Sequence, residues 1–83
     1  MSYELTFEEV VKMTLFEGNK GMFQGENFKR GCYLQADNDV LSLYEYLLDD
    51  SVCPEFMGAP IFSRGLLTQK YREVFTRQDL FEK

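Results

Sequence analysis

Two aromatic residues flank the only adjacent pair of basic residues in this chain. The basic pair is Lys29 and Arg30, within the segment "GMFQGENFKRGCYLQADND" that spans residues 21–39. Phe28 precedes the pair and Tyr33 follows it. Aromatic rings can stack on a nucleobase, and a neighbouring lysine or arginine can bind a phosphate. The candidate ligand-binding residues of this kind are Phe28, Lys29, Arg30, Tyr33, Tyr71 and Arg72.

The same rings also have a structural interpretation. Phe28 and Tyr33 can belong to the core, which is the commoner fate of aromatic residues in small sheets. Gly25 and Gly31 bound the segment, and a glycine lets the backbone come close to a partner or simply ends a strand. The residues alone leave both interpretations open: a recognition surface, or an ordinary strand with a solvated turn.

The residue types needed for catalysis or metal binding are scarce. The chain has no histidine to act as a base, and neither Cys32 nor Cys53 has an evident activating neighbour. Two isolated cysteines do not make a zinc site. Adjacent acidic residues in turns are usually solvated, and the glycines do not follow a nucleotide-binding spacing. We therefore expect no enzyme, no metal and no cofactor. The acidic pairs are Glu8–Glu9, Asp37–Asp39 and Asp49–Asp50.

Length and charge narrow the class of protein. The 83 residues predict a single domain over 1–83 with a thin core. The net charge is −5, and residues 1–59 hold eleven acidic and four basic residues. Direct nucleic-acid binding is disfavoured, because it needs clustered lysine and arginine. No apolar run approaches the ~20 residues that span a bilayer. An acidic body can instead face a basic partner.

The cysteines and aromatic residues bear on location and assembly. With two cysteines and no signal peptide, the chain is expected in a reducing cytoplasm, with both thiols buried and no disulfide. Eight phenylalanines and five tyrosines are many rings for a small core. Surplus aromatic residues favour an interface, and two-fold symmetry is the commonest arrangement. We therefore expect a homodimer or a dimer of dimers.

The elements that must position these residues predict an α+β fold, with one N-terminal helix packed on a small antiparallel β-sheet. Thr6 and Glu9 form a capping-box pattern, which predicts a helix from about Phe7 to Glu17. Gly18 suits the position after the last turn. Dense glycines then interrupt short apolar runs at 22–23 and 32–34, which read as strands.

The second half of the chain is less regular. "ADND" at 36–39 predicts a hairpin turn before "VLSLYEYLL" at 40–48, which we interpret as a strand, although its periodicity also fits a helix. Residues 49–60 resemble a loop, and their prolines confine any strand there to an edge. "SRGLLTQKY" predicts a helical turn, "KYREVFTRQ" a strand, and "TRQDLF" a final turn.

Two stretches give the chain a family resemblance. "TFEEVV" at 6–11 and "NFKRGCYL" at 27–34 resemble the opening helix and first hairpin of the small phage-encoded proteins that include the Thoeris anti-defence sponge. "FSRGLLTQKYREV" at 62–74 resembles their close. Phe28 and Tyr71 stand where the family has tryptophan, and the basic residue usual before the first tryptophan is replaced by Gln24 or Gly25.

The resemblance implies a non-enzymatic phage protein that counters a host defence system by stoichiometric binding. Some members of such families sequester a cyclic nucleotide signal at subunit junctions. Related small proteins instead bind and block a host nuclease, polymerase or CRISPR-type effector. The acidic charge of this chain is compatible with the second activity, in which an acidic face mimics nucleic acid. Both partners, a cyclic nucleotide signal and a host defence protein, remain open from the sequence.

Overall fold

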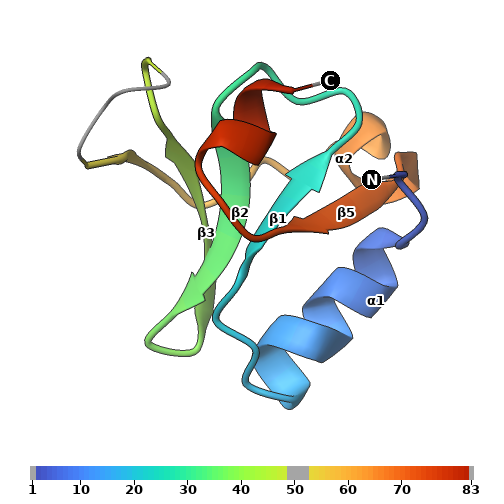
Figure 1. Cartoon of the computed structure of the whole chain (residues 1–83). Coiled ribbons are helices and arrows are strands. Elements are labelled where there is room, and N and C mark those ends of the chain that lie inside the picture. Colours follow the sequence, from blue (N-terminus) through green and yellow to red (C-terminus); the bar gives the residue numbers. More distant parts are fainter. Residues whose placement is uncertain (1, 49–52, 83) are drawn as a thin grey trace.

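The computed structural model describes residues 2–48 and 53–82. In this part of the chain, five strands form one antiparallel sheet in the order β4-β3-β2-β1-β5, next to an N-terminal helix (Figure 1). The predicted α+β fold class is therefore confirmed. The strands are β1 (Met22–Gly25), β2 (Cys32–Asp37), β3 (Val40–Glu45), β4 (Glu55–Gly58) and β5 (Tyr71–Val74). The helical elements are α1 (Phe7–Val11), η1 (Lys12–Phe16), α2 (Arg64–Thr68) and η2 (Gln78–Phe81).

The N-terminal helix begins at the predicted Phe7 and ends at Phe16, one residue before the predicted end. The Thr6 hydroxyl accepts a hydrogen bond from the Glu9 N–H at 3.2 Å, and the Glu9 carboxylate accepts one from the Thr6 N–H at 3.0 Å. This reciprocal pair satisfies two N–H groups that a helix start leaves free. The helix continues from α1 into the π-helical turn η1, and Gly18 follows it with a φ of +77°. The left-handed conformation of Gly18 stops the helix.

The hairpin of β2 and β3 confirms the turn predicted at 36–39. Asn38 and Asp39 have φ of 52° and 62°, so both central residues are left-handed. Such a two-residue turn has a twist that matches that of the flanking strands. The segment at 40–48 forms a strand, as interpreted, rather than a helix. The strand covers only its first part and ends at Glu45.

The two edges of the sheet differ in how they form. β4 is the outermost strand on one side, as expected from Pro54 and Pro60 on either side of it. Its register on β3 shifts by one residue at Met57, which forms a bulge. At the other edge, β5 pairs with β1 and also forms a bridge with Leu5. The predicted acidic pair at 49–50 lies outside the described residues.

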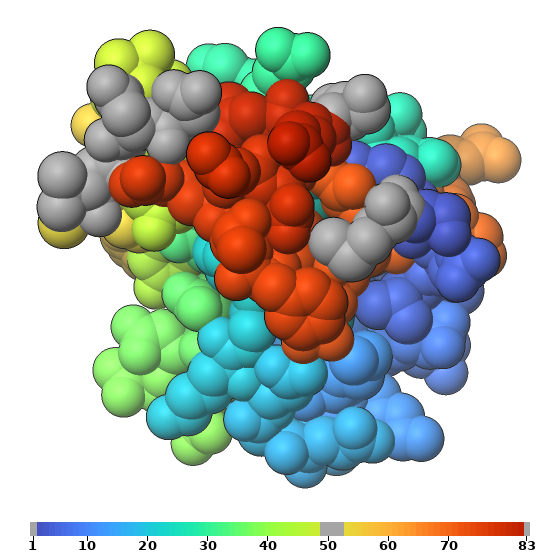
Figure 2. Space-filling model, viewed as in Figure 1, coloured from blue at the N-terminus to red at the C-terminus, as the bar shows by residue number. Residues whose placement is uncertain are grey.

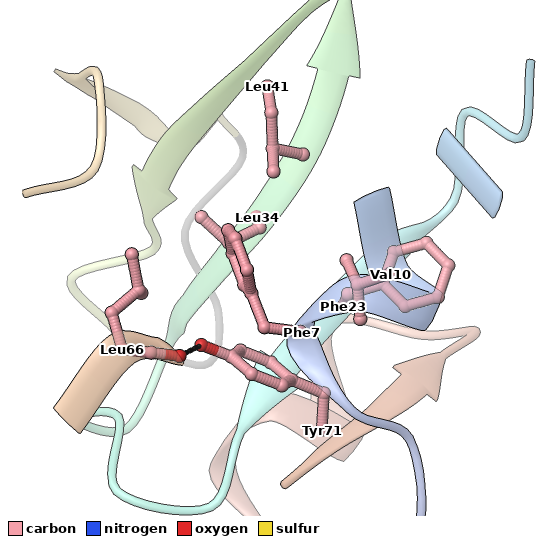
Figure 3. Close-up of a cluster of buried hydrophobic side chains, with 7 residues drawn as sticks. All are labelled: Phe7, Val10, Phe23, Leu34, Leu41, Leu66 and Tyr71. Atoms are coloured by element: carbon pink, nitrogen blue, oxygen red, sulfur yellow. Dashed lines mark hydrogen bonds between the residues drawn. The ribbon is translucent and has the colours of Figure 1, made fainter. Parts of the chain in front are cut away.

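One face of the sheet carries the main core, shown in Figure 3. Helices α1 and α2 pack on this face, and their side chains meet residues that alternate along β1, β2, β3 and β5. Alternation is the expected result of the two-residue period of a strand. The buried side chains of this cluster are Phe7, Val10, Phe23, Leu34, Leu41, Leu66 and Tyr71.

The opposite face is covered by the C-terminal residues. In Figure 1 the turn η2 lies in front of β2, and in Figure 2 the same segment covers the centre of this face. Leu80 of η2 is fully buried against Tyr33 and Val74. The Asp79 N–H donates to the Thr76 hydroxyl at 3.3 Å, so the predicted final turn is present. The sheet thus has a helical element on each face.

The burial expected for the two cysteines is wrong for one of them. Cys32 is half-buried on β2, but Cys53 is exposed. Cys53 precedes the edge strand β4, and among the described residues its side chain is exposed. None of the described helices is long and apolar enough to cross a membrane.

Candidate functional site

A cavity of about 470 Å³ opens on the face of the sheet that carries α2. It lies between the β1–β2 loop, the edge of β3 and β4, and the segment that leads into α2. Most of its lining is apolar, with a few polar groups among the apolar ones, which is the usual composition of a binding pocket. We call it the Phe28 cavity; its wall includes Asn27, Phe28, Lys29, Cys32, Leu43, Met57, Pro60, Ile61, Leu66 and Gln69.

The β1–β2 loop is held against the cavity by backbone hydrogen bonds. The Asn27 N–H donates to the Gln69 side-chain oxygen at 2.9 Å, and the Phe28 N–H donates to the Gly25 carbonyl at 3.0 Å. The Phe28 ring meets the Tyr71 ring edge-on, with centroids 5.8 Å apart. A side chain at Gly25 would collide with Gln69, so this close approach requires glycine.

The opposite wall is formed by the start of α2 and the bulge of β4. The Ser63 hydroxyl caps α2 by accepting a hydrogen bond from the Leu66 N–H at 3.1 Å. Pro60 is buried, whereas Ile61 is 85% exposed and extends the apolar rim of the cavity. Met57 reaches the cavity from the bulge and is half exposed. Buried residues such as Pro60 and Leu66 therefore lie beside an exposed apolar rim.

An ion pair lies at the β3 end of the cavity. The Lys29 ammonium lies 3.0 Å from the Glu45 carboxylate, and the two side chains are 76% and 8% exposed. The hydrogen bond to Glu45, followed by the charge of that carboxylate, raises the pKa of Lys29 above its usual value. Lys29 is therefore engaged with an acidic side chain of its own chain.

The six residues predicted from the sequence do not form one site. Phe28 and Lys29 line the Phe28 cavity, and Arg30 next to them is exposed. Tyr71 lies in the core on the same face of the sheet, and it is fully buried. Its hydroxyl donates to the Leu66 carbonyl oxygen, as Figure 3 shows. A ligand in the cavity thus meets the Phe28 ring but not the Tyr71 hydroxyl.

Arg72 lies on the other face of the sheet, where it holds the C-terminal turn. Its guanidinium donates to the Gln24 side-chain oxygen at 2.8 Å and to the carbonyl oxygens of Asp79 and Glu82 at 2.6 and 2.7 Å. It also lies over the Tyr3 ring, 4.8 Å from the ring centroid. Arg72 is almost fully buried, so these contacts give it a structural role.

Tyr33 shares that face and is also buried. Its ring stacks on Tyr44 and Tyr46, with centroids 5.6 and 5.8 Å apart. Burial, and then the neighbouring Tyr46 and Tyr44, raise the pKa of Tyr33 well above its usual value. The core interpretation thus describes the position of Tyr33 well, because almost none of its surface is accessible to a ligand.

Several residues of the Phe28 cavity had no signal in the sequence. Gln69 is nine-tenths buried and fixes the loop, but a lone glutamine in a polar segment looks like a solvated residue. Glu45 reads as the polar face of a strand, and its contact with Lys29 depends on the fold. Met57 lies within the segment at 49–60 that resembled a loop, and Ile61 directly follows that segment. Only the glycine-bounded segment around Phe28 indicated this region.

The comparisons and the side-chain inventory add two findings. No protein-family model, curated protein or solved structure matches this chain. Within residues 2–48 and 53–82, no three histidine, cysteine, aspartate or glutamate side chains are grouped so that they could hold a metal ion. The geometry shows an apolar pocket with a glutamine amide in its wall and an ion pair at its β3 end.

Proposed function

We propose that this chain is a non-enzymatic protein that counters a host defence system by stoichiometric binding to a host protein. The observation that supports it best is the apolar rim of the Phe28 cavity. Met57 and Ile61, which line the cavity, are 50% and 85% exposed, and Phe62, next to Ile61 in the chain, is 70% exposed. Clusters of exposed apolar residues beside a pocket are typical of protein-binding surfaces, where such residues act as anchors.

The charge of the chain supports the same kind of partner. The net charge is −5, which favours a basic partner surface such as that of a nuclease, polymerase or other nucleic-acid-binding effector. In this proposal an acidic face takes the place of nucleic acid, and the apolar rim supplies the affinity. The chain would act in the cytoplasm of the host cell, where such effectors work.

Sequestration of a cyclic nucleotide is the second candidate function. It is favoured by the Phe28 ring and the Gln69 amide beside an apolar cavity, together with the exposed Arg30. A ring can stack on a base, and an exposed arginine can bind phosphate. It ranks second because Arg72 bonds to its own chain and Lys29 is paired with Glu45.

Self-association is part of the proposal. Besides the cavity rim, Phe16 and Phe56 are 82% and 66% exposed. So many exposed rings on a small protein favour a homodimer or a dimer of dimers, because burying them gains free energy. Sedimentation velocity at micromolar concentration tests this, and a strict monomer would contradict it.

The function is tested in bacteria that each carry one cloned defence system. Expression of the chain should restore phage growth in the strain whose effector it binds, and native mass spectrometry should show a complex with that purified effector. Ile61→Asp should abolish both effects, whereas Phe75→Asp, an equally drastic change at a comparably exposed residue outside the cavity, should abolish neither.

Two outcomes would contradict the protein-binding proposal. One is that no defended strain loses protection. The other is that Ile61→Asp and Phe75→Asp behave alike. If heat-denatured protein instead releases a cyclic nucleotide, and Arg30→Ala weakens its binding about ten- to a hundredfold as expected for a lost charge-assisted hydrogen bond, the second candidate replaces the first.

A further inference from the structure

Two glutamates lie directly opposite each other on β3 and β4, at the end of the Phe28 cavity. Glu45 pairs with Glu55, and Glu45 also pairs with the cavity residue Cys32 on its other side. Directly opposed residues of antiparallel strands project from the same face, with Cβ atoms about 4.5–5.5 Å apart. Like charges at this distance repel each other, so the arrangement favours a cation between the carboxylates.

The cation that the chain itself supplies is weakly held. Lys29 reaches Glu45 from the β1–β2 loop, and three-quarters of its side chain is exposed. Exposed ion pairs contribute little to stability, because the ammonium remains hydrated and its long side chain must be ordered. The Glu45 carboxylate, by contrast, is 8% exposed and has no other ion pair or hydrogen bond in the described part of the chain. Another cation can therefore displace Lys29 from the buried Glu45 carboxylate.

An amide in the wall of the same cavity offers a hydrogen-bond donor to a ligand. Gln69 is nine-tenths buried, and its side-chain oxygen accepts the Asn27 N–H. A backbone N–H can only donate, so this contact assigns the oxygen and leaves the amide nitrogen with two N–H groups. Among residues 2–48 and 53–82 that nitrogen bonds to no acceptor, and it is not enclosed by protein, so water reaches it. A carbonyl oxygen of a bound partner can replace this water, so a partner that brings one suits this wall.

We propose that the Phe28 cavity binds an arginine side chain of the partner protein, with its guanidinium displacing Lys29 at the Glu45–Glu55 pair. The inference rests on the proposed function, because it names the chemistry by which the host protein is recognised. Met57 and Ile61 provide an apolar wall for the arginine stem. The carbonyl of the bound segment accepts the free N–H of Gln69.

The geometry favours arginine over the other charged ligands. A guanidinium carries five N–H donors in a planar fork, so it can bond two carboxylates at once, whereas an ammonium acts as a point charge. An anion that drew Lys29 away would leave Glu45 buried without a cation, which is costly. Arginine is also among the residues that most often dominate the energy of protein interfaces.

The test is a titration of the whole chain with N-acetyl-Gly-Arg-Gly-amide, followed by amide NMR at low salt. Its uncharged counterpart, with citrulline in place of arginine, is the control peptide. The shifts should be confined to the cavity, including Lys29, Glu45, Glu55 and the Gln69 side-chain amide. The arginine peptide should bind about tenfold or more tightly than the citrulline peptide, as expected for charge-assisted hydrogen bonds.

Two matched variants separate this site from general attraction to an acidic protein. Lys29→Ala and Arg30→Ala remove the same charge from neighbouring residues, but only Lys29 covers Glu45. Lys29→Ala should tighten binding of the arginine peptide about two- to fivefold, because no ion pair has to be broken, whereas Arg30→Ala should change it little. Glu55→Gln, at an exposed position, should weaken binding about tenfold.

The opposite results would overturn the arginine site. Such results are equal binding of the two peptides, shifts spread over the acidic surface, or a Lys29→Ala variant that binds no better than Arg30→Ala. Retained defence inhibition with no peptide binding would overturn the site and leave the proposed function standing. Peptide binding of the expected pattern without defence inhibition would support the site and count against the function alone.

Discussion

Replacing Tyr71 by phenylalanine tests whether this residue is structural or belongs to a binding site. The substitution keeps a ring that is fully buried and removes only the hydroxyl, which donates to the Leu66 carbonyl oxygen. That carbonyl lies near the end of α2, where a helix has no further N–H to offer it. A buried acceptor left without a donor costs about 1–3 kcal/mol.

The expected result is a loss of stability with no loss of binding. For a domain of this size, about 1–3 kcal/mol corresponds to a fall in Tm of roughly 4–24 °C. The matched control is Tyr44→Phe, because the Tyr44 hydroxyl makes only a 3.5 Å contact with Asp37 at the surface, and its loss should cost less than about 0.5 kcal/mol. Thermal melts followed by circular dichroism measure both. Equal and small shifts in the two variants would refute the assignment of Tyr71 to the core.

Three further predictions concern pH, the hairpin and the C-terminal turn. Burial raises the pKa of Tyr71 from 10.0 to about 12, so the folded state holds this proton to higher pH than the unfolded state does. The free energy of unfolding should therefore be undiminished below pH 10 and fall by up to about 2–3 kcal/mol towards pH 12. Urea unfolding at stepped pH measures this fall, which should be smaller in Tyr71→Phe. Asp39→Gly should stabilise the protein by about 0.5–1 kcal/mol, because φ is 62° there; an unchanged urea midpoint would contradict this. Leu80→Ala should cost about 2–5 kcal/mol, because the side chain is fully buried, and a melt within 2 °C of wild type would exclude that role.

Local signals predicted the fold well. The Thr6–Glu9 capping box and the turn residues at 38–39 act through contacts within a few positions, so their effect is legible without the rest of the chain. The strand at 40–48 needed the preceding turn to be distinguished from a helix, and its end at Glu45 had no local mark. The ends of helices and strands depend on tertiary packing, and a short sequence pattern carries no information about that packing.

The candidate site was predicted only in part, because residue type does not reveal the face on which a residue lies. Tyr71 and Arg72 are adjacent, yet the strand period sends one into the main core and the other beneath the C-terminal turn. By residue type, Tyr71 can stack on a base and Arg72 can bind phosphate, but the structure shows both side chains bonded within the chain. Gln69 and Glu45 matter at this site because the fold buries them, and the burial of a single polar residue cannot be predicted from the sequence pattern.

The basic pair in this acidic chain has different environments at its two positions. Lys29 covers Glu45, an acid that the sheet places opposite Glu55, whereas Arg30 beside it is exposed and has no ion pair in the described part of the chain. If the pair were a phosphate clamp, loss of either residue would weaken binding of an anion. If Lys29 covers an acidic pocket, its loss alone exposes a buried carboxylate and strengthens binding of a cation. The two hypotheses therefore predict opposite signs for Lys29→Ala, and this one substitution decides which charge the cavity recognises.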